Sequence, residues 1–358
     1  MKCASYFEYT SAADPSNFMT TASRHVFPSS IHDTPGGPSG VFHLDASAEL
    51  NLISPATSPN LLASFIRLAG ESATIRVSAV ATSSVYYVIR GSGVSSTTSS
   101  ASTSDSGTTT TTTSTSSDSS STTRSSLSLE SCPNARPPSS AGSRSTSFSS
   151  SSSCQHYSLS WAEGDVFSLP GGAAEHSSTV DSALIWLCDA PLLSYLNVVP
   201  VAGSGLPPAL YTAANIAAEL AAANAQRGSG TRNRNGVLLG HVALPETRTA
   251  TATLWALYNL LPAGVVQPPH RHASVAIDYA VKAGPNVYTL MSPTLSSDGL
   301  LVNPIRADWV TGAVFTTPPG WWHSHHNDSR EDAIVLPLQD AGLYTHMRTL
   351  SIEFAKTK

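Results

Sequence analysis

The chain has 358 residues, a formal net charge of −5 and only 12% charged residues. This length allows two domains of ordinary size, and the weak negative charge without a basic run argues against a nucleic-acid or membrane-surface partner. The chain contains no apolar stretch of about 18 residues, so no membrane-spanning helix is expected.

The N-terminal residues and the cysteines bear on the cellular compartment. Residues 1–19 lack the charged-then-apolar order of a secretory signal, while a transit peptide, which is defined by composition, stays open. The four cysteines form no CxxC pair, and two of them flank a low-complexity tract. We interpret them as free thiols in a reducing compartment and expect a cytoplasmic protein. They are Cys3, Cys132, Cys154 and Cys188.

The first part of the chain, up to residue 93, alternates short apolar runs with turn signals. Residues 61–68 predict one strand, and residues 85–91 predict a second, rich in β-branched and aromatic side chains. Residues 94–153 are almost entirely serine and threonine. They cannot bury enough apolar surface to offset the entropy of ordering, so we expect a disordered insertion in a hairpin loop. A barrel tolerates such an insertion because loop-closure entropy grows slowly with length.

The chain then returns to strand patterns on both sides of one helical segment. Residues 157–161 and 164–172 continue the first domain, and the alanine-rich residues 211–226 predict a linker helix that ends near Gly228. Many strands separated by Gly and Pro turns, with almost no other helix, favour a β-barrel or sandwich. The strands expected after the linker are 251–260, 274–282, 287–291, 313–316, 333–337 and 348–354.

Two histidine motifs lie in the last third of the chain. The first places His270 and His272 six and eight residues after a glycine, and the second places His323 three residues after Gly320. Side chains at i and i+2 project from the same face of a strand. Because His323 can return on a neighbouring strand after the Gly/Pro turn, the three imidazoles are expected to converge on one point, as a transition metal requires.

These two motifs resemble the paired motifs of the cupin superfamily, small antiparallel barrels that bind a metal inside. The chain is most similar to bicupins of the gentisate 1,2-dioxygenase type, which cleave aromatic rings with Fe(II) and O2. Where most cupins place a ligand glutamate, this chain has Ile277, with Asp278 beside it. An aliphatic side chain cannot ligate, and Asp278 would face the other side of a regular strand. We therefore expect a site of His270, His272 and His323 alone.

The first half of the chain resembles a cupin that has lost its metal site. The position of its second-motif histidine falls on Glu175, with His176 one residue later, and Val77 and Ala79 occupy the region of its HxH pair. The sequence thus predicts an all-β protein of two cupin barrels, each a double-stranded β-helix or jelly roll. The predicted units are an N-terminal cupin without metal ligands (1–200), a helical linker (201–236) and a metal-binding cupin (237–358).

Three neutral imidazoles leave a divalent ion its full charge and up to three adjacent open positions. A chelating substrate and O2 could bind side by side there, and their proximity would supply much of the rate. Imidazole ligands also suit Cu, Ni and Zn. Fe(II) is therefore the metal that the family resemblance implies, and other divalent metals stay open.

Further side chains near the motifs are candidates for catalysis or substrate binding. The resemblance implies that His325 is the acid/base group, and an imidazole can take a phenolic proton near neutral pH. Gln267 could face the cavity, and Arg306 could clamp a carboxylate. Each also has a structural interpretation, such as a hydrogen bond to the barrel wall or a surface ion pair. The candidate pocket residues are Trp322, Asn327 and Tyr279.

Together these features predict a mononuclear non-haem dioxygenase that acts on a small chelating aromatic acid, phenol or diketone with O2. Gentisate itself is less expected because residues 278–282 lack the arginine of the corresponding strand in gentisate-type enzymes. Two alternatives stay open: a metal-dependent isomerase or lyase that needs no O2, and a non-catalytic binding or storage bicupin. Cupin barrels tend to associate, so a homo-oligomer is compatible with the sequence.

Overall fold

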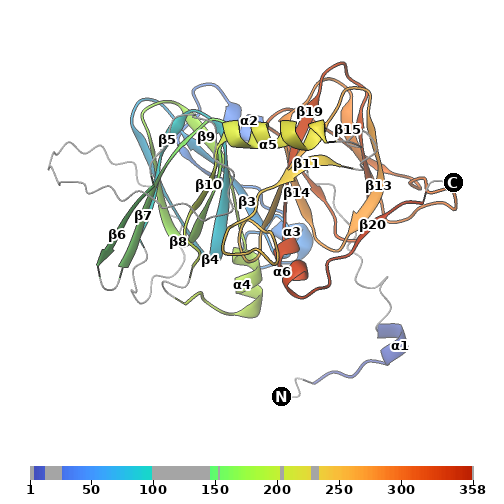
Figure 1. Cartoon of the computed structure of the whole chain (residues 1–358). Helices are drawn as coiled ribbons and strands as arrows, with labels where there is room; N and C mark the ends of the chain where they lie inside the picture. Colours follow the sequence, from blue (N-terminus) through green and yellow to red (C-terminus); the bar gives the residue numbers. More distant parts are fainter. Residues whose placement is uncertain are drawn as a thin grey trace.

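The computed structural model describes residues 4–12, 26–98, 146–151, 154–201, 205–226 and 234–356. Two antiparallel β-barrels lie side by side, and helix α5 (Ala213–Ala225) lies between them at one end (Figure 1). The predicted all-β, two-barrel architecture is therefore confirmed. Residues 99–145 and 152–153 of the predicted insertion lie outside the described residues, whereas its two ends form strands β5 (Ser92–Thr98) and β6 (Thr146–Ser151).

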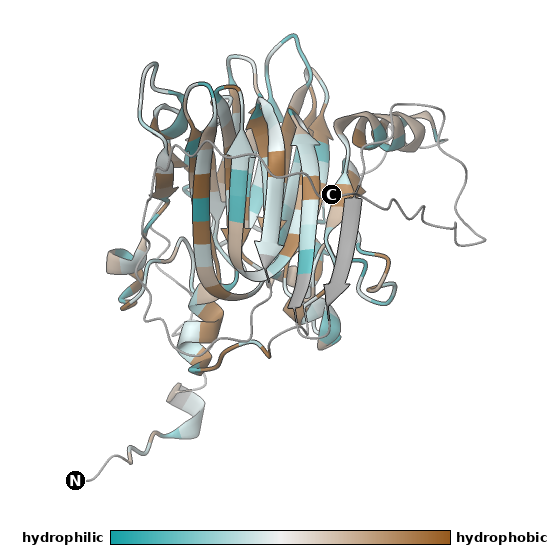
Figure 2. Cartoon of the chain, turned by 90° about the vertical axis from the view of Figure 1, so that its left-hand side faces the viewer, coloured by the Kyte–Doolittle hydropathy of each residue, from teal (hydrophilic) through white to brown (hydrophobic). Residues whose placement is uncertain are grey.

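The first barrel is built from one nine-stranded sheet in the order β2-β3-β9-β4-β8-β5-β7-β6, with β10 paired to β8. Hydrophilic and hydrophobic residues alternate along its outer strands (Figure 2), as expected for strands with one face in a core. Its interior is filled by large aromatic and aliphatic side chains, including Tyr86, Trp161 and Phe167. Its remaining strands are β2 (Gly40–His43), β3 (Leu62–Leu68), β4 (Ala73–Arg90), β7 (Cys154–Ala162), β8 (Val166–Ser178), β9 (Ser182–Cys188) and β10 (Ala209–Tyr211).

The second barrel consists of two sheets. A six-stranded sheet has the order β1-β17-β14-β19-β12-β11, and a five-stranded sheet has the order β16-β15-β18-β13-β20. The five-stranded sheet carries both histidine motifs. The strands of the second barrel are β1 (Val26–Phe27), β11 (Asn235–Leu238), β12 (Trp255–Leu261), β13 (Val266–His272), β14 (Ala276–Lys282), β15 (Val287–Ser292), β16 (Ile305–Asp308), β17 (Val314–Thr317), β18 (Trp322–Asn327), β19 (Ala333–Gln339) and β20 (Ile352–Phe354).

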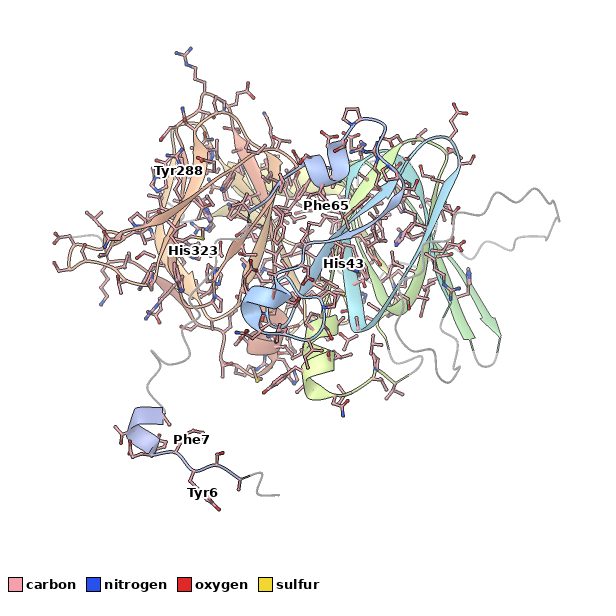
Figure 3. All side chains as sticks on the ribbon, turned by 180° about the vertical axis from the view of Figure 1, so that it is seen from behind. Tyr6, Phe7, His43, Phe65, Tyr288 and His323 are labelled. Carbon is pink, nitrogen blue, oxygen red and sulfur yellow. The ribbon has the colours of Figure 1, made fainter. Side chains whose placement is uncertain are left out.

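One hydrophobic core joins the two barrels. It contains Phe65 and Ile185 from the first barrel and Ile277 and Leu336 from the second. Strands β3 and β9 are buried at every position. Their sequences are nearly continuous apolar runs because one face lies inside the barrel and the other against the second barrel. Phe65 lies between the barrels, whereas His323 lies within the second one (Figure 3).

Two short strands cross the domain boundaries that the sequence predicts. Strand β1, near the N-terminus, pairs with β17 of the second barrel, with Val26 opposite Phe315 and Phe27 opposite Val314. Strand β10, inside the predicted linker, pairs with β8 of the first barrel. The ends of the sheets therefore do not coincide with residues 200 and 237.

The predicted linker helix is present as α5, whose N-cap Thr212 accepts a hydrogen bond from the Asn215 backbone N–H. It ends at Ala225, and Gly228 lies outside the described residues. No described helix is long and apolar enough to cross a membrane. The other helices are single turns or little more, namely α1 (Tyr9–Ala12), α2 (Ser30–Asp33), α3 (Ser47–Leu50), α4 (Ala190–Leu196) and α6 (Ala341–His346).

The interpretation of the cysteines as free thiols can be examined at one of the four positions. Cys188 is a free, buried thiol at the end of β9. Cys3 and Cys132 lie outside the described residues, as does the side chain of Cys154.

Candidate metal centre

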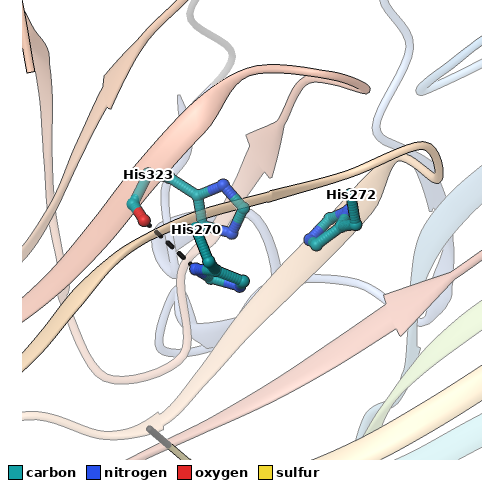
Figure 4. A group of neighbouring side chains, drawn as sticks. All are labelled: His270, His272 and His323. Carbon is teal, nitrogen blue, oxygen red and sulfur yellow. Dashed lines mark hydrogen bonds between the residues drawn. The ribbon is translucent and has the colours of Figure 1, made fainter. Parts of the chain in front are cut away.

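The three predicted ligands come together inside the second barrel. His270 and His272 lie on β13, and His323 lies opposite His270 on the adjacent antiparallel strand β18. Each side chain is buried, and each offers one ligand nitrogen within 4.8 Å of the other two (Figure 4). Among the described residues, no other histidine, cysteine or acidic group belongs to this cluster.

Backbone carbonyl groups orient the three imidazole rings. The Nδ1 atoms of His270, His272 and His323 lie 3.1, 2.8 and 3.0 Å from the carbonyl oxygens of His323, Ser274 and Trp321, respectively. A carbonyl oxygen only accepts hydrogen bonds, so Nδ1 of His272 and Nδ1 of His323 donate, and Nε2 of each of these two rings keeps its lone pair. This is the arrangement that metal-ligating histidines usually adopt.

Burial keeps these imidazoles neutral. It lowers the pKa of His272 to about 4, and it holds the pKa values of His270 and His323 well below their ordinary range. The neighbouring histidines and Arg234 lower the pKa of His270 further because positive charges repel. Protons therefore compete little with a metal ion for these nitrogens at neutral pH.

Asp278, rather than Ile277, faces the site, which corrects the expected alternation of strand β14. Ile277 belongs to the core between the barrels, whereas Asp278 lines the histidine pocket. The carboxylate of Asp278 accepts a 2.6 Å hydrogen bond from the Thr317 hydroxyl. Burial raises its pKa to about 7. It nevertheless lies outside the group of atoms close enough to share one ion.

The pocket has a polar and an apolar wall. Besides the histidines and Asp278, it is lined by the polar side chains Asn259 and Gln339 and by Leu257, Ala276 and Pro337. Its apolar residues offer a surface for an aromatic ring, and its polar groups could orient the substituents of that ring.

Arg234 is the pocket residue that the sequence analysis missed. Its Nη2 atom lies 2.8 Å from Nε2 of His270 and closer still to Nδ1 of the same ring. Burial lowers the pKa of this guanidinium to about 9, and Asp278 raises it, so Arg234 is cationic at neutral pH. Arg234 directly precedes β11, and only the pairing of β11 with β12 brings it to the site. In the sequence it stands in a polar stretch that looks like linker.

His325 also lines the pocket, two residues after His323 on the same strand. Its Nδ1 atom lies 2.8 Å from the hydroxyl of Thr289, which in turn accepts a 2.8 Å hydrogen bond from the Trp309 indole. Burial lowers the pKa of His325 well below its ordinary value. Gln267 lies opposite His325, is buried, and hydrogen-bonds Asn259 behind the pocket wall.

Arg306 does not reach the pocket, which corrects its predicted role as a carboxylate clamp. Its guanidinium forms an ion pair with Asp308, with 2.7 Å between Nη2 and Oδ1, on the outer side of the barrel. It also lies 3.6 Å from the ring centroid of Tyr288. Of the two roles considered for Arg306, the structure therefore shows the surface ion pair.

The three candidate pocket residues also lie elsewhere. Trp322 is next to a ligand and so faces the outside of the strand, where Arg271 lies 4.7 Å from the centroid of its ring. Asn327 closes a turn by donating hydrogen bonds to the Leu261 and Glu331 carbonyls. Tyr279 points into the interface between the barrels, with its ring 5.3 Å from that of Tyr87.

Strand register gives the equivalent positions in the first barrel. Val77 lies opposite Ala174, just as His270 lies opposite His323. The equivalent of the third ligand is therefore Ala174, one residue before the predicted Glu175. His176 takes the place of His325, and its side chain is buried inside the barrel, while Glu175 is exposed.

No family model matches the chain. A 5-aminosalicylate 1,2-dioxygenase of Comamonas sp is 27% identical over 111 residues, which are 31% of this chain and only about a quarter (27%) of that protein.

Solved structures cover nearly the whole chain. A salicylate 1,2-dioxygenase variant from Pseudoaminobacter salicylatoxidans, in complex with gentisate, has a TM-score of 0.60 and 12% identity, covering 98% of this chain and 91% of that one. An oxalate decarboxylase from Lactobacillus farciminis has a TM-score of 0.50 and 11% identity, covering 90% of this chain and 87% of that one. The chain therefore has the two-barrel cupin fold of these enzymes, as the two histidine motifs predict.

Proposed function

We propose that the protein is a mononuclear non-haem iron dioxygenase that acts on a small aromatic acid able to chelate a metal. The observation that carries this proposal is the cluster of His270, His272 and His323, buried and neutral, with each Nδ1 bound to a carbonyl group. The names of the similar proteins, which act on aminosalicylate and salicylate, support the substrate class.

Iron(II) is the metal that the resemblance to gentisate-type enzymes implies, and the donor set fits it. Three imidazoles suit a borderline transition metal and contribute no negative charge. His270, His272 and His323 would hold the ion, and when bound it would supply the redox chemistry that a reaction of an aromatic acid with O2 requires. The chain's own residues would hold the ion, orient the ring and neutralise the acid.

Arg234 is the residue that we propose binds the substrate carboxylate. Its guanidinium lies against the ring of His270, so a substrate chelated at the histidine cluster would have its carboxylate within reach. Arginine binds carboxylates through two parallel hydrogen bonds. The cationic Arg234 and a metal ion held by the histidines would both attract an anionic substrate.

Other pocket residues offer groups that could contact the rest of such a molecule. Leu257 and Pro337 would contact the faces or edges of the ring, while Asn259 and Asp278 lie where they could bind a hydroxyl or amino substituent. With a pKa raised to about 7, Asp278 can donate or accept a hydrogen bond near neutral pH.

The test combines metal analysis with oxygen uptake on the full chain purified without air. We expect about one iron per chain, and oxygen consumption with salicylate, 5-aminosalicylate or gentisate that matches loss of the aromatic absorbance. The His272→Ala variant should lose both metal and activity. His326→Ala is the matched control, because His326 lies on the same strand but stacks on Tyr288 outside the pocket.

Two results would contradict this proposal. Full iron occupancy in His272→Ala would remove the histidine cluster as the metal site. Turnover of an aromatic acid without oxygen consumption would instead favour an isomerase or lyase.

A further inference from the structure

Two buried residues, Thr289 and Trp309, form a hydrogen-bonded chain behind His325. Thr289 on β15 lies directly opposite His325 on β18, and its hydroxyl oxygen is 2.8 Å from Nδ1 of that histidine. The indole nitrogen of Trp309 lies 2.8 Å from the same hydroxyl oxygen. Thr289 is completely buried, and Trp309 and His325 are nearly so.

The chemistry of these groups fixes the direction of each hydrogen bond. An indole N–H can only donate, so Thr289 accepts from Trp309. The Thr289 hydroxyl then has one hydrogen to donate, and in the described part of the chain the acceptor that it contacts is Nδ1 of His325. A buried hydroxyl hydrogen without an acceptor would destabilise the fold. Nδ1 of His325 therefore carries the lone pair, and the ring proton is on Nε2.

This is the opposite tautomer to that of the ligands His272 and His323. Each of these two rings holds Nδ1–H against a carbonyl and presents the Nε2 lone pair. His325 lies close by, with its ring centroid 5.6 Å from that of His323, and lines the same pocket. An Nε2 that carries a hydrogen cannot ligate, so His325 would leave the remaining metal positions open.

We infer that Thr289, held by Trp309, is a positioning residue that makes His325 a hydrogen-bond donor through Nε2–H. This inference rests on the proposed function for its acceptor, which is an anionic oxygen of the chelated aromatic acid. His325 would thus stabilise negative charge on that oxygen. Proton abstraction, the role expected from the sequence, needs the Nε2 lone pair and hence the other tautomer.

The first barrel contains the same arrangement without the metal ligands. The Trp161 indole donates to Ser95, and the Ser95 hydroxyl lies 2.7 Å from Nδ1 of His176. Ser95 lies opposite both His176 and Leu159, as Thr289 lies opposite His325 and Ala307. His176 Nε2, however, is buried and has no hydrogen-bond partner among the described residues. The two trios therefore have the same hydrogen-bonded arrangement, and His325 of the second trio lines the pocket of the histidine cluster.

Nitrogen NMR tests the tautomer directly. The full chain, labelled with ¹⁵N-histidine and loaded with diamagnetic Zn(II), gives two-bond correlations that report which ring nitrogen carries hydrogen. The His325 signals are assigned by their absence in His325→Gln. We expect Nε2–H in the wild type and in Thr289→Ser, and a mixture of both tautomers in Thr289→Val, because valine neither donates to Nδ1 nor accepts from it. An Nδ1–H tautomer in the wild type, or an unchanged tautomer in Thr289→Val, would overturn the inference.

Kinetic measurements then test whether the Nε2–H donor of His325 contributes to the rate of the reaction. With metal content unchanged, Thr289→Val should lower kcat roughly 10-fold or more, and Thr289→Ser should restore it to within about 3-fold. His325→Gln keeps an N–H donor but no base, so it should retain at least about 10-fold more activity than His325→Ala. Equal losses in these two variants would argue against a donor role.

Ser95→Ala is the matched control, since it breaks the equivalent trio in the first barrel. It should lower thermal stability and leave kcat unchanged. If it lowers kcat as much as Thr289→Val does, the second trio has only a structural role and the inference fails. If the wild type consumes no oxygen with any aromatic acid, the proposed function fails, while the NMR measurement still decides the tautomer.

Discussion

Arg234 shows how one side chain can change the electrostatics of a pocket. Charged residues are scarce in this chain, at 12%, yet Arg234 lies against a metal-ligand candidate and near the ionisable Asp278. The pocket otherwise contains neutral imidazoles and amides. A cation at this place favours anionic ligands over neutral phenols or diketones of similar size.

Replacing Arg234 by methionine should raise KM for carboxylate substrates by about 10- to 100-fold, because a charge-assisted hydrogen bond of roughly 1.5–3 kcal/mol is lost. Metal content should not fall. Steady-state kinetics with salicylate and with phenol measures the effect, and phenol, which has no carboxylate, should show a smaller change. Arg306→Met, at the exposed ion pair with Asp308, is the control. An unchanged KM for salicylate would contradict the role of Arg234.

The sequence predicts the residues of the site unevenly, for a physical reason. The three candidate ligands can be predicted because the spacing of the HxH pair, and of the histidine that follows the Gly/Pro turn, determines which face of a strand they occupy. Arg234 and Thr289 are not visible because their positions depend on strand pairs, β11 with β12 and β15 with β18. Asp278 was assigned to the wrong face because the sequence pattern of β14 does not show which of its two buried faces lines the site.

At the level of elements, each barrel has a buried aspartate between a strand near its end and the short helix that follows. Asp189 follows β9 and precedes α4, and Asp340 follows β19 and precedes α6. Each carboxylate accepts a backbone N–H from its own barrel, those of Thr82 and Val275, respectively. Each also accepts a hydrogen bond from a side chain of the other barrel, Thr253 for Asp189 and Asn60 for Asp340. The two aspartates thus tie the barrels together reciprocally.

The hydrogen bonds of Asp340 extend to the candidate metal centre. Asp340 holds the backbone N–H of Val275, and the preceding residue, Ser274, supplies the carbonyl that orients His272. The Ser274 hydroxyl also donates to Gln339, which lines the pocket. Contacts between the barrels therefore support the position of a ligand, although the first barrel contributes no ligand of its own among the described residues.

The Asp340 tie should make stability depend on pH in a definite direction. Burial raises the pKa of Asp340 to about 6, so the folded chain keeps this proton at a pH where the unfolded chain has lost it. Its contribution is fully present below the unfolded value of about 4 and is lost as pH rises to about 6.

The asparagine of Asp340→Asn cannot ionise. The melting temperature of this variant, relative to that of the wild type, should therefore be higher at pH 7 than at pH 4.5. Thermal unfolding of both proteins at the two pH values measures this difference. Asp308→Asn, at an exposed ion pair, is the control and should show no such change. A stability difference between Asp340→Asn and wild type that does not vary with pH would contradict the expectation.

The strands differ in how well the sequence predicts them. Strands β3, β4 and β14 are rich in apolar and β-branched residues, and the sequence predicts β3 and β14 nearly whole but only the C-terminal part of β4, from residue 85. Strands β13 and β18 contain proline, glutamine and several histidines, so only their histidine spacing indicated them. Strands β1 and β10 have only two and three residues. They form by pairing with β17 and β8, which are distant in the sequence, so their own residues do not indicate them.

At the scale of the whole molecule, the two barrels share one core and should unfold together. Phe65 and Ile277 belong to the same buried cluster although they come from different barrels. Losing the contacts in this cluster would expose apolar side chains of both barrels at the same time. Single-transition unfolding is therefore expected, in contrast to the separate transitions of loosely joined domains.

Phe65→Ala should lower the free energy of unfolding by about 3–5 kcal/mol, the usual cost of deleting a buried phenylalanine side chain. Calorimetry should show one transition at lower temperature for the variant, not a shifted and an unshifted transition. Val180→Ala, at a residue that is 44% exposed, serves as the control with little effect. Two resolved transitions in the wild type would contradict a shared core.

Strand β1 has a consequence for how the protein is made. The segment that carries Val26 and Phe27 leaves the ribosome long before its partner β17, which begins at Val314, is synthesised. Until β17 is made, this segment cannot pair in its final sheet, and until β1 pairs with it, the second barrel has an open edge at β17. Open edges attract other strands, so correct closure depends on the tethered segment arriving before a second nascent chain does.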